Sequence, residues 1–240
     1  MPTAYDAIAP KYARHRESQP FVVETLRQLQ EQVSGNAMLE VGCGTGDYAA
    51  AMASSSSCTV YALDPSREML RHAPELEALH RVQGHAGSLP VADATLDMIY
   101  SVNMIHHLDA VAPYFREAFR ALEPGGILCT ATDSKAIIRR RKPLSLYWPS
   151  TVPVELERYH GIETLNAEMS AAGFRAMDSR EGRSTFSIAD TEPYRDKAFS
   201  CLQMITEDAF QSGLRAMEAD LRAGPVEGNS ELVFLWGRRP

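Results

Sequence analysis

The feature that most constrains this chain is a set of three glycines at alternate positions, directly after an apolar run. The segment reads Leu39-Glu40-Val41-Gly42-Cys43-Gly44-Thr45-Gly46-Asp47. Glycines tolerate positive φ and let a ligand approach the backbone closely, and the helix expected after them begins with free N–H groups. A strand, a glycine loop and a helix in this order indicate a nucleotide site at the carboxyl edge of an open α/β sheet.

The glycine spacing separates several kinds of nucleotide site. A dinucleotide fingerprint requires G-x-G-x-x-G, whereas here the third glycine is Gly46 and Asp47 follows it, which disfavours a nicotinamide oxidoreductase. The sequence also lacks the Gly-Lys-Ser/Thr ending of a phosphate-binding P-loop. Glu40 and Asp47 flank a loop that holds no Lys or Arg, so a cationic or zwitterionic ligand with hydroxyl groups fits better than a pyrophosphate.

A second acidic position follows the next apolar run, Val60-Tyr61-Ala62-Leu63-Asp64-Pro65-Ser66. Asp64 lies 18 residues after Gly46. An acidic residue about 20 residues past such a loop holds a ribose diol in nucleotide-binding folds, because an ionised carboxylate accepts the hydrogen bonds that two hydroxyls donate. We therefore expect Asp64 to contact a ribose.

Short apolar runs alternate with amphipathic stretches along the chain, which predicts a doubly wound, Rossmann-like α/β fold. The expected mixed sheet has seven strands, the last of them antiparallel. The strands are expected at Ala37–Val41, Cys58–Asp64, His80–Gln83, Leu96–Val102, Gly126–Thr132, Phe174–Ser179 and Glu231–Arg238. The helices are expected at Phe21–Gln32, Thr45–Ala53, Arg67–Ala73, Ala110–Leu122 and Glu163–Ala172, and Tyr194–Leu221 has helical periodicity throughout.

Length and composition favour one domain with additions. The 240 residues predict a single domain, with a cofactor-binding core at 35–133 and helical lid or substrate-cap segments at 1–34, 134–160 and 190–224. The net charge of −7 argues against a nucleic-acid partner. The sequence shows neither a secretory h-region nor a bilayer-spanning apolar run, so we expect a cytoplasmic protein without a membrane partner, either monomer or homodimer.

The combined motifs resemble the class I S-adenosylmethionine-dependent methyltransferases, in the small-molecule branch that includes the ubiquinone and menaquinone biosynthesis enzymes. Four segments carry the resemblance: LEVGCGTG (39–46), ALDPS (62–66), GHAGSLPVADATLDMIYS (84–101) and LEPGGIL (122–128). The opening Tyr5-Asp6-Ala7-Ile8-Ala9, with Tyr12, also looks like the first helix of that branch. The resemblance covers residues 4–133 well and the 160–180 and 230–238 regions more loosely.

The resemblance implies S-adenosyl-L-methionine as cofactor, S-adenosyl-L-homocysteine as product and no metal. By this analogy Glu40, Gly42 and Gly44 hold the amino acid portion, Asp64 holds the ribose, and Pro65, Ser66 and Met69 lie beside the ribose and adenine. The family usually has an Asp-Ala pair after the third strand, where this chain has His85-Ala86, followed by Gly87. Tyr5, Tyr12 and Arg16 either close over the cofactor as a lid or belong to an ordinary surface helix. In the lid, Arg16 would pair with the methionyl carboxylate.

The fourth strand ends in Ser101-Val102-Asn103-Met104-Ile105-His106-His107, where the resembling family faces both the sulfonium and the substrate. Ser101 and Asn103 are therefore expected at the cofactor. Transfer of a methyl group from a sulfonium is an SN2 displacement that rests largely on positioning. A hydroxyl or ammonium acceptor also needs a general base, for which His106 and His107 are the candidates, with His107 read as mainly architectural. The predicted acceptor is a small molecule, methylated at O, N or C.

Three other interpretations stay open. The chain could bind the cofactor without methylating anything, since fold does not fix function. A thiol-assisted metalloid methyltransferase would need converging thiols, and the chain has Cys43, Cys58, Cys129 and Cys201. The basic run Arg139-Arg140-Arg141-Lys142 either draws an anionic substrate or is a solvated charge run.

Overall fold

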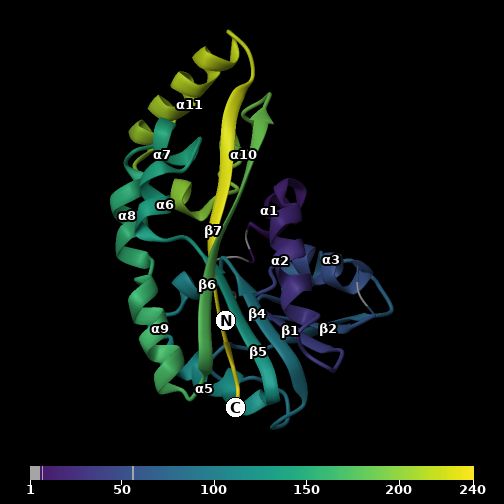
Figure 1. The fold of residues 1–240 in the computed structure, drawn as a ribbon. Coiled ribbons are helices and arrows are strands. Elements are labelled where there is room, and N and C mark those ends of the chain that lie inside the picture. The colour runs from purple at the N-terminus through teal and green to yellow at the C-terminus, as the bar shows by residue number, and fades with distance from the viewer. Residues whose placement is uncertain (1–5, 7, 56) are drawn as a thin grey trace. The chain divides into compact units, whose positions relative to one another are not determined.

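The computed structural model describes residues 6 and 8–55 together with 57–240. Its helices and strands alternate as the sequence predicts (Figure 1). The strands are β1 (Ala37–Val41), β2 (Thr59–Asp64), β3 (Leu79–Gln83), β4 (Leu96–Val102), β5 (Leu122–Thr132), β6 (Arg175–Ile188) and β7 (Val226–Arg238). The helices are α1 (Ala9–His15), α2 (Pro20–Gln30), α3 (Asp47–Ser55), α4 (Arg67–Arg71), η1 (Ile105–His107), α5 (Ala112–Ala121), α6 (Lys135–Arg140), α7 (Leu144–Tyr147), α8 (Thr151–Arg158), α9 (Ile162–Ala171), α10 (Glu192–Arg195), η2 (Ser200–Gln203) and α11 (Glu207–Leu221).

The strands form one seven-stranded mixed sheet in the order β3-β2-β1-β4-β5-β7-β6. Neighbouring strands from β3 to β5 are parallel, and β7 runs antiparallel to them. Near its end β7 is fixed to β5 by paired backbone bonds, from Gly125 N to Arg239 O (2.7 Å) and from Arg239 N to Gly126 O (3.0 Å). The predicted fold class, including an antiparallel last strand, is confirmed.

The chain divides into two compact units. Unit 1 comprises Met1–Thr132, Ile162–Arg180 and Phe234–Pro240, and unit 2 comprises Asp133–Gly161 and Glu181–Val233. Of the segments expected to form caps, 1–34 belongs to unit 1, whereas 134–160 and 190–224 belong to unit 2. Each unit is described below by itself.

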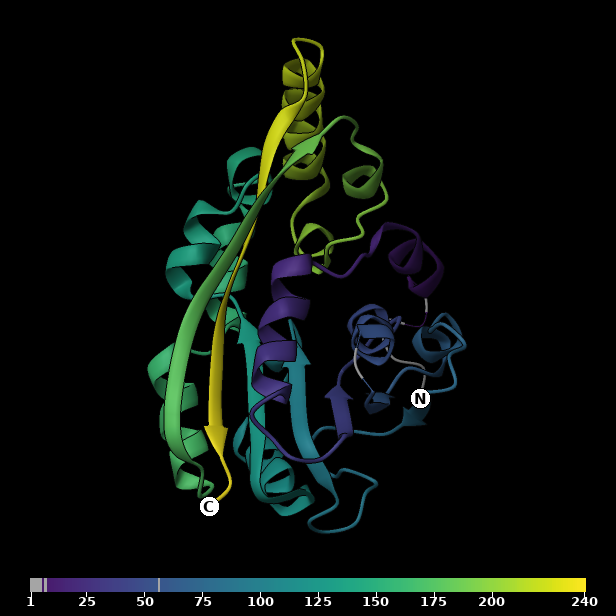
Figure 2. The same cartoon turned by 45° about the vertical axis from the view of Figure 1, so that its right-hand side comes forward.

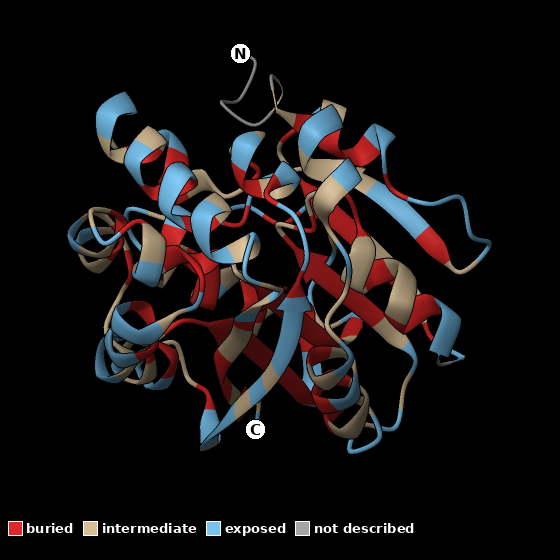
Figure 3. Ribbon diagram, turned by 90° about the horizontal axis from the view of Figure 1, so that it is seen from above, coloured by how far each residue is buried: buried red, intermediate tan, exposed pale blue. Residues whose placement is uncertain are grey.

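Unit 1 holds the parallel strands between two helical layers. Helix α2 packs against α3, β4 and β5 (Figure 2), and α5 packs against α9 and β5. The central strands are apolar and almost completely buried, with Met38, Leu39, Met98, Ile99 and Leu128 at 0% exposure. This matches a parallel sheet covered on both faces, as the buried strands and the exposed outer sides of the helices show in Figure 3.

Unit 2 has its own apolar core, centred on Trp148. The indole stacks with the rings of Tyr194 (centroid distance 5.5 Å) and Phe210 (6.4 Å), and its Nε1 donates to the carbonyl oxygen of Phe210 at 2.9 Å. Gly213 allows this packing because a Cβ there would lie 2.3 Å from the indole nitrogen. The aromatic residues of this region are therefore core residues of unit 2.

The helical periodicity over Tyr194–Leu221 does not correspond to one continuous helix. The segment contains the end of α10, the 3₁₀ turn η2 and α11, which begins only after Thr206. Thr206 caps α11, since its hydroxyl accepts a hydrogen bond from Ala209 N at 3.3 Å. Ile205 and the apolar residues of η2 face the Trp148 core without being part of one long helix.

Among the described residues, the helices are too short or too polar to serve as membrane spans.

Candidate functional site

The glycine loop lies in unit 1, where β1 ends. The amides of Gly42 and Cys43 both donate to the carbonyl oxygen of Leu63, at 2.7 and 3.0 Å, so the loop is fixed to the end of β2. Gly42 has φ +73°, and a Cβ at this position would lie 2.1 Å from Cγ of Met104. Only glycine combines that φ with so close a neighbour.

Asp64 orders the same loop from the end of β2. Its Oδ2 accepts from Gly44 N at 2.9 Å and its Oδ1 from Ser66 N at 2.8 Å. The side chain is buried, and burial raises the pKa of this carboxyl, although the two backbone amides oppose that shift. Each carboxylate oxygen can accept more than one hydrogen bond, so Asp64 retains acceptor capacity for the hydroxyls of a ligand.

The turn after Asp64 starts α4. Ser66 is the N-cap residue, and its hydroxyl accepts from Met69 N at 3.1 Å. The same hydroxyl donates to Oδ1 of Asp6, and the carboxylate of Asp6 adds negative charge near Asp64. The carbonyl oxygen of Pro65 accepts from Gln83 Nε2 at 3.1 Å, which ties this turn to the end of β3.

Glu40 is a buried carboxyl at the carboxyl end of β1. It is 1% exposed, and its Oε2 has no hydrogen-bond partner among the described residues. Burial raises its pKa well above the usual range, and the nearby carboxylates of Asp47 and Asp64 raise it further. Hydrogen bonding from the backbone of Ala49 and from Tyr100 acts in the opposite direction on this pKa. Leaving the other oxygen of a buried carboxyl without a partner is costly, so the position suits an ammonium donor.

Helix α1 places an aromatic ring on the glycine loop. A Cβ at Gly44 would lie 3.5 Å from Cε1 of Tyr12, so the ring is in van der Waals contact with the loop. The guanidinium of Arg16 lies 4.6 Å from the centroid of the Tyr12 ring, a cation–π distance. The predicted lid residue Tyr5 and position Ala7 of the opening motif lie outside the described residues.

The segment after β3 carries the predicted adenine contacts. His85 is exposed and close enough to Asp64 for its positive charge to lower the pKa of that carboxyl. The amide of Ser88 donates to the carbonyl oxygen of His85 at 3.1 Å, which forms a tight turn. Ala86 is buried in this turn and Gly87 is exposed. His85 therefore belongs to the Asp64 side of the site.

The end of β4 turns sharply into η1. Asn103 has φ +52°, in the left-handed region, and its backbone N–H donates to the carbonyl oxygen of Ala131 at 2.9 Å. His106 is 8% exposed, whereas His107 is exposed, and their ring centroids are 4.1 Å apart. The hydroxyl of Ser101 pairs with that of Thr130 at 2.5 Å within the sheet. Cofactor contact by Ser101 stays a prediction.

Comparison with known proteins points to a methyltransferase domain. Residues 39–130, which contain the glycine loop, Asp64 and the end of β4, match the model of a methyltransferase domain. The chain also adopts the fold of solved methyltransferases over nearly its full length. Residues 39–130 thus carry a methyltransferase domain, and the comparisons support a class I S-adenosylmethionine-dependent methyltransferase.

Individual relatives are distant. The chain is 35% identical over 130 residues to a malonyl-[acyl-carrier protein] O-methyltransferase of Pectobacterium atrosepticum, covering 54% of this chain and 51% of the relative. It thus spans about half the length of that curated relative. A proposed methyltransferase of an antibiotic biosynthesis pathway in Anabaena variabilis is structurally similar, with TM-score 0.69, 20% identity, and 90% and 96% of the two chains covered.

A third relative was solved with a ligand. The structure of phosphoethanolamine N-methyltransferase 2 of Haemonchus contortus in complex with S-adenosyl-L-methionine matches with TM-score 0.64 and 18% identity. The match covers 98% of this chain and 57% of that one. At this identity the likeness shows a shared fold.

Sequence reasoning missed three residues at the glycine loop. Met104 packs against Gly42, Asp6 accepts from Ser66, and Tyr100 lies beside Glu40 within β4 and β1. Asp6 was visible as part of the opening motif, but nothing in the sequence indicated its partner. The packing of Met104 and Tyr100 depends on strand register, which the sequence pattern does not specify.

The four thiols do not converge. All are buried, and burial raises the pKa of Cys129 and of Cys201 to about 12. Among the residues that the structure describes, no thiol belongs to a cluster of three or more potential metal ligands. Nothing in this arrangement favours a metalloid methyltransferase.

The basic run of unit 2 is largely ion-paired. Arg140 donates to Glu231, Lys142 to Glu227, and Arg141 to Asp133. Arg139 is exposed and donates to a backbone carbonyl. The run is therefore not a block of free positive charge.

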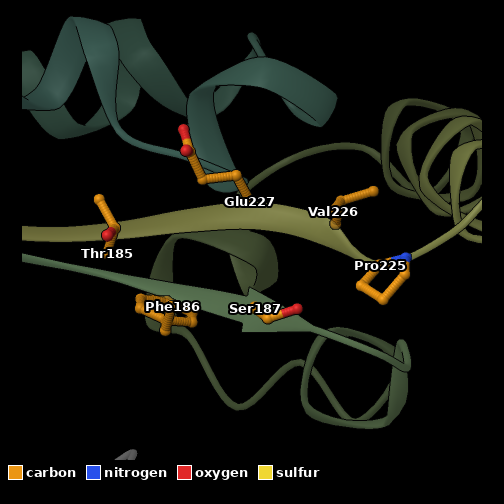
Figure 4. A pocket seen from close by; sticks show the side chains of 6 residues that line it. All are labelled: Thr185, Phe186, Ser187, Pro225, Val226 and Glu227. Atoms are coloured by element: carbon orange, nitrogen blue, oxygen red, sulfur yellow. The ribbon is translucent and has the colours of Figure 1, made fainter.

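A shallow pocket of about 360 Å³ lies in unit 2, on the facing ends of β6 and β7 (Figure 4). Its lining is Thr185, Phe186, Ser187, Pro225, Val226 and Glu227. Glu227 is paired with Lys142 at 3.0 Å, and the remaining side chains are apolar or hydroxylic. None of the predicted site residues lines this pocket.

Proposed function

We propose that this protein transfers the methyl group of S-adenosyl-L-methionine to a small-molecule acceptor. The observation that supports this most is the pair of buried carboxyls beside the glycine loop, Glu40 and Asp64. Among the described residues, no Lys or Arg forms an ion pair with either of them. A ligand that brings an ammonium and a ribose diol would satisfy both groups, and it would be cationic as the loop composition favours.

Each part of the site has a defined task in this proposal. Glu40 accepts from the ammonium of the ligand, and Asp64 accepts from the ribose hydroxyls while its other lone pairs hold Gly44 N and Ser66 N. The backbone at Gly42 and Gly44 lets the methionyl portion approach. Arg16 pairs the ligand carboxylate beside the Tyr12 ring. Pro65, Met69 and the His85–Gly87 turn border the adenine.

When bound, S-adenosyl-L-methionine supplies an electrophilic methyl group on a sulfonium centre. The protein then has to orient the acceptor and exclude water. Asn103 and His106, at the sharp turn after β4, are the groups we assign to the acceptor side. His106 takes the proton of a hydroxyl or ammonium acceptor through a ring nitrogen. The exposed His107 supports the His106 ring by contact.

Binding is the first test of this function. Isothermal titration with S-adenosyl-L-methionine, S-adenosyl-L-homocysteine and NADH should give micromolar binding of both sulfur nucleotides and no binding of NADH. Binding without methyl transfer to any member of a broad small-molecule panel would favour a cofactor-binding protein that does not methylate. Absence of binding by both sulfur nucleotides would refute the proposal.

The role of His106 is tested with the acceptor that a labelled-methyl screen identifies. His106→Ala should lower turnover by about 10²- to 10⁴-fold, the usual contribution of a general base, with cofactor affinity unchanged. His107→Ala is the matched control and should change turnover much less. A His106→Ala enzyme that turns over as fast as the parent would remove this residue from the mechanism.

A further inference from the structure

Strand β6 forms one edge of the sheet. It comes last in the order β3-β2-β1-β4-β5-β7-β6, so within the described part of the chain only one of its two sides pairs with another strand. The segment Glu181–Ile188 is the part of β6 that belongs to unit 2, and it contains no proline that would interrupt a backbone ladder. An exposed strand edge presents unpaired N–H and C=O groups that can pair with another chain.

The side chains of this segment alternate between two faces of the sheet. The ring of Phe186 lies over β7, because a Cβ at Gly228 would be 2.5 Å from it. Glu181 points to the opposite face, where its Oε2 lies 3.7 Å from Arg140 Nη2. Arg183 is two residues further along the strand, so Glu181 and Arg183 share one face of the edge strand.

Neither charge on this face is fully matched within the chain. Arg140 donates to Glu231 at 2.6 Å, so it is only a loose neighbour of Glu181, whose side chain is 65% exposed. Arg183 is exposed, and its side chain forms no ion pair or hydrogen bond with another described residue. A carboxylate and a guanidinium, two residues apart, are therefore both accessible on the edge strand.

Two-fold symmetry limits how two copies of this segment can pair. In an antiparallel pair related by a two-fold axis, one residue lies opposite its own counterpart, and residues at equal distances on either side of it lie opposite each other. A centre at Glu181 or at Arg183 would place like charges opposite each other. A centre at Gly182 places Glu181 of each copy opposite Arg183 of the other, which gives two attractive cross-strand pairs.

We propose that the unit 2 part of β6 pairs with the same segment of a second copy of this chain, antiparallel and centred on Gly182. Charges on an edge strand usually prevent pairing with other strands. Here the charges oppose a centre one residue away on either side and favour the centre at Gly182. Because each copy has one β6 edge, the assembly closes as a dimer. This interface does not depend on the proposed function.

Sedimentation velocity of the full chain tests this interface. The parent should be a dimer at micromolar concentration. Arg183→Glu and Glu181→Arg each bring like charges together twice in the dimer, so each variant should raise the dissociation constant of the dimer at least about tenfold. Arg215→Glu is the matched control, because it reverses an exposed cation on α11, and it should dimerise like the parent.

A mixture and a cross-link test the register. When Arg183→Glu and Glu181→Arg are mixed, one chain carries two negative and the other two positive charges at these positions, so heterodimers should form although each variant alone dissociates. Gly182→Cys should cross-link two chains under oxidised glutathione, because opposite Cα atoms about 4.5–5.5 Å apart lie within disulfide reach. Thr185→Cys lies off the centre and should cross-link much more slowly. The four native thiols are buried.

Three outcomes would overturn the proposal. The first is a parent chain that stays monomeric over the whole concentration range. The second is a dimer that both charge reversals leave intact, since its interface would then lie elsewhere. The third is a mixture of the two variants in which no heterodimer forms. Circular dichroism checks that the variants fold. If neither charge-reversal variant folds, the cross-linking of Gly182→Cys decides, and a failure to cross-link contradicts the proposed pairing.

Discussion

Each unit of the molecule buries two carboxyl groups, and the units neutralise them differently. In unit 1, Glu40 and Asp64 lie beside the glycine loop, where backbone amides hold Asp64. In unit 2, Asp133 and Glu155 are paired with arginines. Buried carboxylates normally have cationic partners. The contrast supports the proposal that the unit 1 carboxyls take a cationic ligand, whereas unit 2 carries its own cations.

The largest expected effect tests the unit 1 half of this contrast. In the proposed function, Asp64→Ala removes two charge-assisted hydrogen bonds to the ribose, each worth roughly 1.5–3 kcal/mol, so binding of S-adenosyl-L-homocysteine should weaken by more than about a hundredfold. Isothermal titration measures this. The control is Asp178→Ala, an exposed carboxylate on β6. If Asp64→Ala binds the nucleotide like the parent, Asp64 does not hold the ribose.

For the carboxylates of unit 2, the comparison predicts a loss of stability and not a loss of ligand binding. Arg141→Gln leaves two buried carboxylates with one fewer cation, which should lower the free energy of unfolding by about 3–5 kcal/mol. Arg140→Gln removes an exposed partner of Glu231 and should cost under about 1 kcal/mol. Urea unfolding of both variants separates the two values. Equal losses would mean that the burial of Arg141 has no energetic consequence.

Gly42→Ala sharpens the comparison from the backbone side. A residue with a Cβ at φ +73° should lower the free energy of unfolding by about 1–2 kcal/mol. The clash with Met104 should lower it by about 1–3 kcal/mol more. In the double variant Gly42→Ala/Met104→Ala the steric clash is relieved, so the part of the stability loss that it causes should disappear. The cost of the positive φ should remain. Urea unfolding of the two singles and the double measures the coupling. Strict additivity would show that the side chain of Met104 does not press on this glycine.

The parts of the fold that the sequence predicts well are the buried ones. Ala37–Val41 and Leu96–Val102 are observed with the predicted bounds, because apolar runs bounded by turn residues have one interpretation. The long ends of β6 and β7 were not predicted. Residues 180–187 are mostly exposed and polar, and strand pairing alone makes them a strand.

How much of the site could be predicted depends on how far apart in the sequence the contacting residues lie. The glycine loop and Asp64 form one local motif, so their proximity could be predicted from spacing. The pairing of Arg141 with Glu155, or of Ser66 with Asp6, joins segments whose contact depends on the tertiary fold. The break before α11 was foreseeable, because Thr206 followed by Glu207 and Asp208 is a helix-start signal, but the continuous apolar periodicity outweighed it.

The smallest expected effect concerns Glu40 and pH. Because burial raises its pKa well above the usual range, Glu40 keeps its proton to a higher pH than an ordinary glutamate does. In the proposed function that proton must leave before the carboxylate can accept from a ligand ammonium. Affinity for S-adenosyl-L-homocysteine should therefore fall as the pH is lowered, down to the loss of one charge-assisted bond, about 1.5–3 kcal/mol.

Titrations at pH values where the ligand's α-amino group stays protonated isolate this effect from the ionisation of the ligand. Proton release is read from the binding enthalpy in two buffers with different ionisation enthalpies. Glu40→Gln should bind more weakly near neutral pH and lose both the pH dependence and the proton release. If the parent releases no proton and binds equally at each pH, Glu40 is not the ammonium partner. Unit 1 would then bury this carboxyl for a structural reason, as unit 2 does its own pair.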